Sequence, residues 1–301
     1  MAPWLLAAGV GAFAGAMVRL RVSARHERTL RALRPRGPDD VVLGGASIAL
    51  EGSSTSAALV LHGFGDTPQS VAPVAHALHA AGWTVRAPLL AGHGRSMRAM
   101  ATHGADDWLA SARHAYAALR ATHAQVCVVG QSMGGALAVL LAVETPPPAL
   151  VLLAPYLSMP LRIRRIARLL RIVAPVVPYW HANSPPRSIH DPAARARALA
   201  HPATSATALA ELARLSATAS ARLPAVTAPT LVLQSREDNR IPPDAAQRAF
   251  DRLGAREKRL EWFTGRGHVL AVDVGHEEIA ARVVTWVEAH AALRTVAPAP
   301  T

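Results

Sequence analysis

One serine of this chain lies in a sequence pattern that places nucleophiles. Gly130-Gln131-Ser132-Met133-Gly134 has the form G-x-S-x-G, with an apolar β-branched run before it (126–129) and an apolar run at helical spacing after it (136–143). A strand, a sharp turn and a helix would lift the Ser132 hydroxyl to the edge of a sheet, above the helix N-terminus. The alternative is a strand–helix turn with an incidental serine. Because both flanking elements are predicted, we expect Ser132 to be a nucleophile.

An activated serine needs a base within reach and an acid that orients the base. The chain has 14 histidines, so position must choose among them. Functional residues of a doubly wound sheet follow the carboxyl ends of its strands. His268 follows the last predicted strand and Asp238 follows the strand before it, which gives the chain order Ser132, Asp238, His268 expected at a nucleophile elbow. Glu237 is the nearest rival acid, and Asp273 is disfavoured because it is close to His268 in sequence.

Acyl chemistry also needs backbone N–H groups that stabilise an oxyanion. Met133 follows the candidate nucleophile and can supply one N–H group from the start of the helix. The loop His62-Gly63-Phe64-Gly65 follows the first predicted parallel strand and can supply the other. We choose the N–H group of Phe64 for that role, and we interpret His62 as a residue that braces the loop rather than as a catalytic group.

The elements that would position these residues alternate along the chain. Near-continuous apolar strands separated by helical patterns predict an α/β fold, a mostly parallel doubly wound sheet covered on both faces. A hairpin around Gly44-Gly45 is expected in Val41–Glu51. The other expected strands are Ala57–Leu61, Thr84–Ala87, 126–129, Leu150–Ala154, Thr230–Leu233 and Arg259–Phe263, and the expected helices are 71–78, Asp107–Thr122, 136–143, Asp244–Leu253 and Glu277–His290.

The alternation stops at Pro155 and resumes near residue 224, and the intervening segment is helical in pattern, rich in Pro and Arg, and without a convincing strand. We interpret it as a helical cap inserted into the sheet unit. A basic amphipathic helix is expected at 161–173; it could cover the site or face an anionic lipid surface. The predicted divisions are 1–18 (apolar segment), 19–40 (basic linker), 41–155 and 224–293 (core), 156–223 (cap) and 294–301 (disordered tail).

Composition excludes several classes of function. The net charge is +12, and Lys258 is the only lysine. Such basicity can indicate nucleic acid, but the arginines cluster only at 19–36 and 162–171, without an aromatic RNA-binding motif or zinc-ligand spacing. We therefore expect no nucleic-acid partner, no metal and no cofactor. The single cysteine, Cys127, excludes an intrachain disulfide and fits a reducing compartment.

The N-terminus predicts a membrane anchor. Residues 2–18 are apolar and uncharged, and arginines follow them. A secretory signal carries its positive charge before the apolar run, whereas here the charge follows it. The positive-inside tendency would then keep the catalytic part in the cytoplasm. A signal sequence, or a start codon placed too early, remains an alternative, so a soluble cytoplasmic or exported protein stays open.

Taken together, the motifs resemble the α/β-hydrolase superfamily, most closely its bacterial carboxylesterases and monoacylglycerol lipases. The likeness spans about residues 57–290 and is carried by Leu61-His62-Gly63-Phe64-Gly65, Gly92-His93-Gly94-Arg95-Ser96, Asp107-Trp108-Leu109, 130–135, 237–243 and Gly267-His268. The resemblance implies Ser132 as nucleophile, Asp238 as acid, His268 as base, and Phe64 and Met133 as oxyanion donors. The apolar N-terminal segment and the strongly basic cap depart from the family pattern.

A serine at the elbow predicts an acyl-enzyme, because relatives that displace halide or open epoxides use an aspartate there. We expect a serine carboxylester hydrolase that acts on small ester substrates with short to medium acyl chains, monoacylglycerol among the candidates. A thioesterase or acyltransferase would use the same residues. A catalytically idle, membrane-tethered binding module is the alternative from another class, and the intact Ser132, Asp238 and His268 argue against it.

Overall fold

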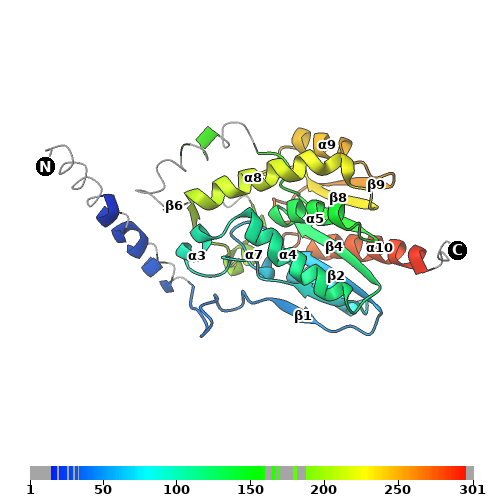
Figure 1. The fold of residues 1–301 in the computed structure, drawn as a ribbon, viewed down its shortest axis with the longest axis horizontal. Helices are drawn as coiled ribbons and strands as arrows, with labels where there is room; N and C mark the ends of the chain where they lie inside the picture. Colours follow the sequence, from blue (N-terminus) through cyan, green and yellow to red (C-terminus); the bar gives the residue numbers. More distant parts are fainter. Residues whose placement is uncertain are drawn as a thin grey trace, which may run out of the picture.

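Seven strands of the described chain form one mixed sheet in a computed structural model (Figure 1). The structure describes residues 15–18, 20–25, 27–29, 31–32, 34–159, 165–166, 169, 179–181 and 188–295. The strand order is β1-β3-β2-β4-β5-β8-β9; β1 is antiparallel to β3 and the other neighbours are parallel. The strands are β1 (Ile48–Leu50), β2 (Ser56–Leu61), β3 (Thr84–Ala87), β4 (Gln125–Gln131), β5 (Leu150–Leu153), β8 (Thr230–Ser235) and β9 (Lys258–Phe263).

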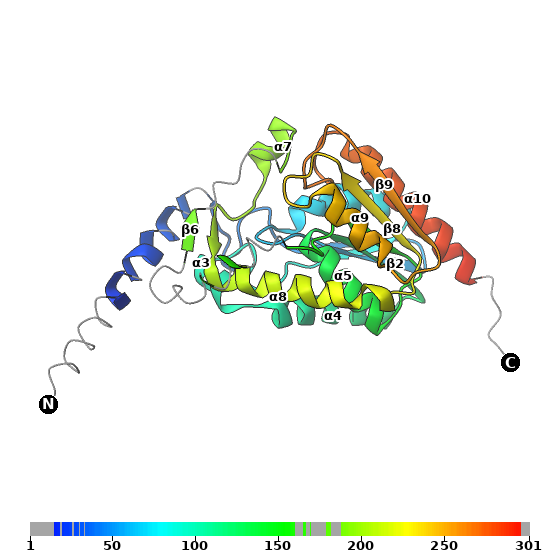
Figure 2. The ribbon, with the colours of Figure 1, turned by 90° about the horizontal axis from the view of Figure 1, so that it is seen from above.

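Helices cover both faces of this sheet, as the apolar strand pattern predicts. Figure 2 shows α4, α5 and α8 on one side of the sheet and α10 on the other. Alternate strand residues divide between the two apolar cores: Leu59 and Val128 pack toward α4, α5 and α8, whereas Val60 and Val129 pack toward α2 and α10. The helices are α2 (Ala72–Ala80), α3 (Met97–Thr102), α4 (Ala105–Arg120), α5 (Met133–Glu144), α7 (Pro192–Arg197), α8 (Ala206–Arg222), α9 (Pro243–Asp251) and α10 (His276–Thr295), with 3-10 turns at Pro68–Val71 and Leu223–Ala225.

The predicted hairpin in Val41–Glu51 is wrong. Only Ile48–Leu50 forms a strand there, and it pairs with β3 rather than with its own neighbours. The earlier residues turn away: Val42 donates its N–H to Gly94 O, and Gly44 has a φ of 82°. The edge of β3 offers backbone N–H and C=O groups that hydrogen-bond with β1. This pairing with a distant strand takes the place of a local hairpin.

The expectation of no strand between 155 and 223 is also wrong. β6 (Tyr179–His181) and β7 (Ala203–Ser205) pair antiparallel, and buried Tyr179 contacts Met97 and Ala203. Three-residue strands carry too little pattern to be recognised in a sequence, because their stability comes from the partner strand. Within the same segment, α8 packs on α5 and shares its apolar core. The division into core and cap stays a prediction.

The basic segment 19–40 contacts the core where it is described. Glu27 Oε1 accepts the Arg98 N–H group in the first turn of α3, at 3.1 Å. Arg36 is nearly buried, and its guanidinium contacts Asp40 at 3.0 Å and Arg95 O at 3.3 Å. The described turns of 15–32 accordingly lie beside α3 and β6 at one end of the molecule (Figures 1 and 2).

In the described part of the chain, no helix combines the length and apolar character needed to cross a bilayer. The anchor predicted in residues 1–18 falls mostly outside the described residues. So do most of the basic amphipathic helix predicted at 161–173 and most of the tail predicted at 294–301, of which α10 includes the first two residues. These three expectations stay predictions.

Candidate active site

The nucleophile elbow lies between β4 and α5, as its sequence pattern predicts. Ser132 has a φ of 54° and a ψ of −116°, a backbone conformation that non-glycine residues rarely adopt. The glycines permit this turn: a Cβ on Gly130 would lie 2.3 Å from Gly134 O, and a Cβ on Gly134 would lie 2.2 Å from Leu61 O. The strained turn therefore presses the helix start against the neighbouring strand and projects Ser132 from the sheet edge.

Three side chains from three different loops meet at this elbow. His268 Nε2 lies 2.7 Å from Ser132 Oγ, and His268 Nδ1 lies 2.8 Å from Asp238 Oδ2. Each of the three residues is less than a tenth exposed. Both distances are within hydrogen-bond range, so the serine O–H can donate to Nε2 while Nδ1–H donates to the carboxylate. The structure thus brings together the nucleophile, base and acid candidates of the sequence.

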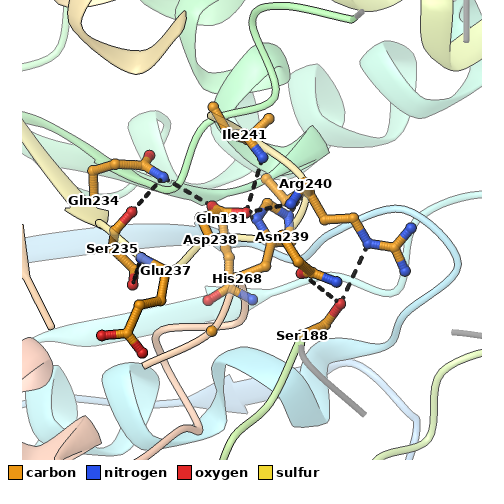
Figure 3. Close-up of polar contacts among 12 residues, drawn as sticks. Gln131, Ser188, Gln234, Ser235, Glu237, Asp238, Asn239, Arg240, Ile241 and His268 are labelled. Carbon is orange, nitrogen blue, oxygen red and sulfur yellow. Dashed lines mark hydrogen bonds and ion pairs between the residues drawn. The ribbon is translucent and has the colours of Figure 1, made fainter. Parts of the chain in front are cut away.

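Asp238 is held as a carboxylate by donors on both of its oxygens. Oδ1 accepts the N–H groups of Arg240 at 2.7 Å and Ile241 at 2.9 Å (Figure 3). Burial alone would raise the pKa of Asp238, but the neighbouring His268 and these backbone donors outweigh burial and hold the pKa below its ordinary value. The acid is therefore ionised at neutral pH and can orient an imidazole.

The two rival acids do other work. Glu237 Oε1 accepts the Gly265 N–H group at 2.8 Å, and its other oxygen lies 3.7 Å from His190 Nδ1. Asp273 accepts four backbone N–H groups from the loop around it and from the segment before α7, those of Gly267, Val274, His190 and Asp191. Neither carboxylate contacts His268, so Asp238 is the acid candidate that geometry supports.

His62 braces the loop beside the elbow, as interpreted from the sequence. Its Nε2 accepts the Leu90 N–H group at 3.2 Å, so Nδ1 carries the proton and donates to Gly63 O at 2.9 Å. Complete burial lowers the pKa of His62 to about 4, although the Gly63 hydrogen bond opposes this shift. An imidazole that is neutral near pH 7 and has both nitrogens in hydrogen bonds is suited to fixing the loop, and it offers a substrate no free nitrogen.

The proposed oxyanion donors flank Ser132. A Cβ on Gly63 would lie 3.3 Å from Ser132 Cβ, so the loop that carries the Phe64 N–H group passes directly over the nucleophile. Met133 is the first residue of α5, where a backbone N–H group has no partner in its own helix. Neither N–H group donates to another described residue. The Phe64 ring packs edge-on against His93 and Trp108, which fixes the loop from behind.

Sequence reasoning missed two buried glutamines that connect these loops. Gln131 Oε1 accepts the Ala271 N–H group at 3.1 Å and so ties the base loop to the elbow. Gln234 Nε2 donates to Asp238 Oδ2 at 2.8 Å (Figure 3). A polar residue with a long side chain directly after the apolar run of a predicted central strand is the sequence signal that could have found Gln234, because such a side chain needs a buried partner.

Asp273 gives a first prediction. Burial would raise the pKa of Asp273. Its backbone donors, of which His190 and Gly267 have the largest effect, hold the pKa below the ordinary value of 3.8. A depressed pKa contributes stability that is complete above the unfolded pKa and disappears as pH falls through the folded pKa. Asp273→Asn should lower the free energy of unfolding by about 2–4 kcal/mol at neutral pH. In urea titrations between about pH 7 and about pH 3, the difference from the parent should shrink below the ordinary Asp pKa; a constant difference would contradict this account.

Comparisons with known proteins agree with the geometry. Residues 52–274 match the hydrolase family described as serine aminopeptidase, S33. The thermostable monoacylglycerol lipase of Bacillus sp. (strain H-257) is 30% identical over 250 residues, which cover 83% of this chain and 97% of the relative. The chain is an α/β hydrolase. A carboxylesterase of Bacillus subtilis (strain 168) is 23% identical, over 77% of this chain and 92% of the carboxylesterase.

A solved structure reported for the metagenome-derived lipolytic enzymes LipS and LipT superposes on the hydrolase with a TM-score of 0.77. It is 30% identical and the alignment covers 83% of the hydrolase and all of that chain. These matches confirm the predicted fold and class: the protein is a serine hydrolase of the carboxylesterase and monoacylglycerol lipase type. Among the residues that the structure describes, no three His, Cys, Asp or Glu side chains form a group that could hold a metal ion.

Proposed function

We propose that the hydrolase cleaves carboxylic esters of short to medium acyl chains through an acyl-enzyme on Ser132. The observation that carries this proposal is the continuous pair of hydrogen bonds from Ser132 Oγ to His268 Nε2 and from His268 Nδ1 to Asp238 Oδ2. A serine in such an arrangement is activated by its base, and the base is held in one tautomer by the acid.

The first half of the reaction transfers the acyl group to the enzyme. Ser132 Oγ attacks the ester carbonyl carbon and its proton passes to His268 Nε2. The carbonyl oxygen gains the negative charge, and the N–H groups of Phe64 and Met133 donate to it. When the bond to the alcohol breaks, His268 returns the proton to the departing alkoxide, and Asp238 stabilises the imidazolium in the interval.

The second half releases the acid. Water gives a proton to His268 Nε2 as its oxygen attacks the acyl carbon, and the same two N–H groups donate to the oxyanion that forms again. The bond to Ser132 Oγ then breaks, and His268 returns the proton to the serine. The products are one carboxylic acid and one alcohol, and the enzyme is restored.

Monoacylglycerol is one proposed substrate. The support is the similarity to the Bacillus enzyme named as a monoacylglycerol lipase, which spans nearly all of that relative. The carboxylesterase relative supports simple esters as a second group. Both groups present the same carbonyl to Ser132 and differ in the alcohol and in the length of the acyl chain.

A substrate series tests this proposal. The parent protein and Ser132→Ala are assayed on p-nitrophenyl acetate, butyrate, octanoate and palmitate, on a monoacylglycerol, and on an acyl thioester. We expect the parent to hydrolyse the shorter esters with higher kcat/KM than the palmitate ester and the thioester. Turnover of the thioester alone would replace the ester proposal with a thioesterase, and no turnover of any substrate would favour an idle binding module.

A further inference from the structure

Gln234 contacts the oxygen of Asp238 on which the base depends. Its side chain is completely buried at the carboxyl end of β8. Gln234 Nε2 lies 2.8 Å from Asp238 Oδ2, the same oxygen that lies 2.8 Å from His268 Nδ1. Figure 3 shows the amide pointing from the strand toward the carboxylate. The acid is thus supported from its own strand as well as from its own loop.

With Gln234 counted, each oxygen of the carboxylate has two donors. Oδ1 accepts from Arg240 and Ile241, and Oδ2 accepts from Gln234 and His268. A carboxylate with donors on both sides cannot rotate without losing hydrogen bonds. The backbone donors fix the position of Oδ1, and Gln234 fixes Oδ2 at the point where it meets the imidazole.

The orientation of the Gln234 amide leaves its own carbonyl oxygen without a hydrogen bond, which indicates that the contact with Asp238 sets this orientation. Nε2 is also within 3.4 Å of Ser235 O, whereas Oε1 is buried without a hydrogen-bond partner among the described residues. The flipped amide would place Oε1 against the negative Asp238 carboxylate. A glutamine that leaves its carbonyl unpaired in order to donate to the acid is oriented by that acid.

We propose that Gln234 is a positioning residue of the triad, which orients the Asp238 carboxylate and disperses part of its charge so that the acid holds His268 without binding its protonated form too tightly. This inference rests on the proposed ester hydrolysis. Gln234 acts through Asp238 and does not touch the reacting atoms.

A pH profile of activity would report the titratable and charged groups that face Asp238 and His268. His268 comes from the loop after β9, Glu237 and Arg240 come from the acid loop itself, Tyr156 comes from the loop after β5, and Asp66, whose charge couples to that of His268, comes from the loop after β2. Burial raises the pKa of Asp66 to about 6, so the parent profile contains its titration as well, and the readout is the shift of the acid limb relative to the parent. Burial raises the pKa of Tyr156, and the charge of Asp238 raises it further against the opposing effect of Arg240. Of these groups, only His268 makes a direct side-chain contact with the carboxylate.

Gln234→Leu removes the donor and keeps a side chain of similar volume, and it also removes the unpaired Oε1. We expect kcat to fall about tenfold with KM nearly unchanged. The acid limb of the kcat/KM profile should move to higher pH, because a carboxylate with one donor fewer attracts the imidazolium more strongly. A merely structural role would lower activity without moving that limb.

Gln234→Glu gives a complementary readout. A protonated carboxyl can still donate to Asp238 Oδ2, whereas an ionised one would place two negative charges in contact, which raises the pKa of the pair. Activity should approach that of the parent at low pH and fall as pH rises through the range in which the parent is constant. If Gln234→Leu does not fold, this profile decides: a parent-like profile would overturn the proposal.

The matched control is Gln247→Leu on α9. Gln247 Nε2 also donates to an aspartate, Asp251 Oδ1 at 2.8 Å, but on the exposed surface, and its loss should leave the kinetics unchanged.

Ser132→Ala distinguishes a failure of the Gln234 proposal from a failure of the proposed ester hydrolysis. Suppose that Ser132→Ala is inactive. If Gln234→Leu then keeps the kcat of the parent, or loses kcat without a shift of the acid limb of its pH profile, the role of Gln234 is refuted and the proposed ester hydrolysis still stands. Full activity of Ser132→Ala would refute the proposed function itself.

Discussion

Ser132→Ala should lower kcat for ester hydrolysis by about 10⁴-fold or more, because it removes the atom that forms the acyl-enzyme. His268 and Asp238 would remain in place but would have no nucleophile to activate. The remaining turnover would come from water held between the base and the oxyanion donors. The measurement is initial-rate kinetics on p-nitrophenyl butyrate, with enzyme concentrations high enough to quantify a very slow rate.

The same variant should keep its fold. Alanine meets the strained backbone at φ 54° with the same Cβ as serine, so the strain of about 1–3 kcal/mol stays as it is. The melting temperature should therefore remain close to that of the parent. Ser111→Ala, in which the lost hydroxyl donates to Asp107 O on the surface of α4, is the matched control and should keep full activity. Activity in Ser132→Ala above a few per cent of the parent would contradict the assignment.

Asp238→Asn should lower kcat by about 10⁴-fold. The N–H groups of Arg240 and Ile241 both point at the Oδ1 position, so the amide oxygen of the asparagine would occupy it. The amide NH₂ group would then face His268 Nδ1 and Gln234 Nε2, which are both donors in the parent. His268 would have to accept at Nδ1 and carry its proton on Nε2, where it cannot take the proton of Ser132.

Glu237→Gln is the control for that experiment, because Glu237 is the adjacent carboxylate and contacts Gly265 rather than His268. It should change kcat by less than about threefold. Similar losses in the two variants would mean that loop structure, rather than the acid, determines activity. A large loss in Glu237→Gln with little loss in Asp238→Asn would make Glu237 the acid.

The sequence was sufficient to predict the sheet and the site wherever local pattern and topology agree. The apolar runs of β4, β5 and β8 are buried along their whole length, so they read clearly as central strands. Because these strands are parallel, their carboxyl ends meet at one edge of the sheet. Placing Asp238 and His268 in the loops after β8 and β9 was therefore enough to bring them to Ser132.

The features that the sequence did not reveal depend on pairing between distant segments. β1 pairs with β3, which lies more than thirty residues further along the chain, and no local signal specifies that choice. β6 and β7 are three residues each and pair with one another although residues 182–202 separate them in the chain. Gln234 follows the apolar run Leu231–Leu233 of β8, and its hydrogen bond to Asp238 becomes evident only when the two residues are seen side by side.

Covalent labelling with a fluorophosphonate, followed by mass spectrometry of the digested protein, tests the central claim most directly. We predict one phosphonyl group on the peptide that contains Ser132, a loss of esterase activity in proportion to labelling, and no label in Ser132→Ala. Asp238→Asn should label far more slowly than the parent. An active protein that resists the reagent, or a label on another residue that accompanies loss of activity, would contradict Ser132 as the activated nucleophile.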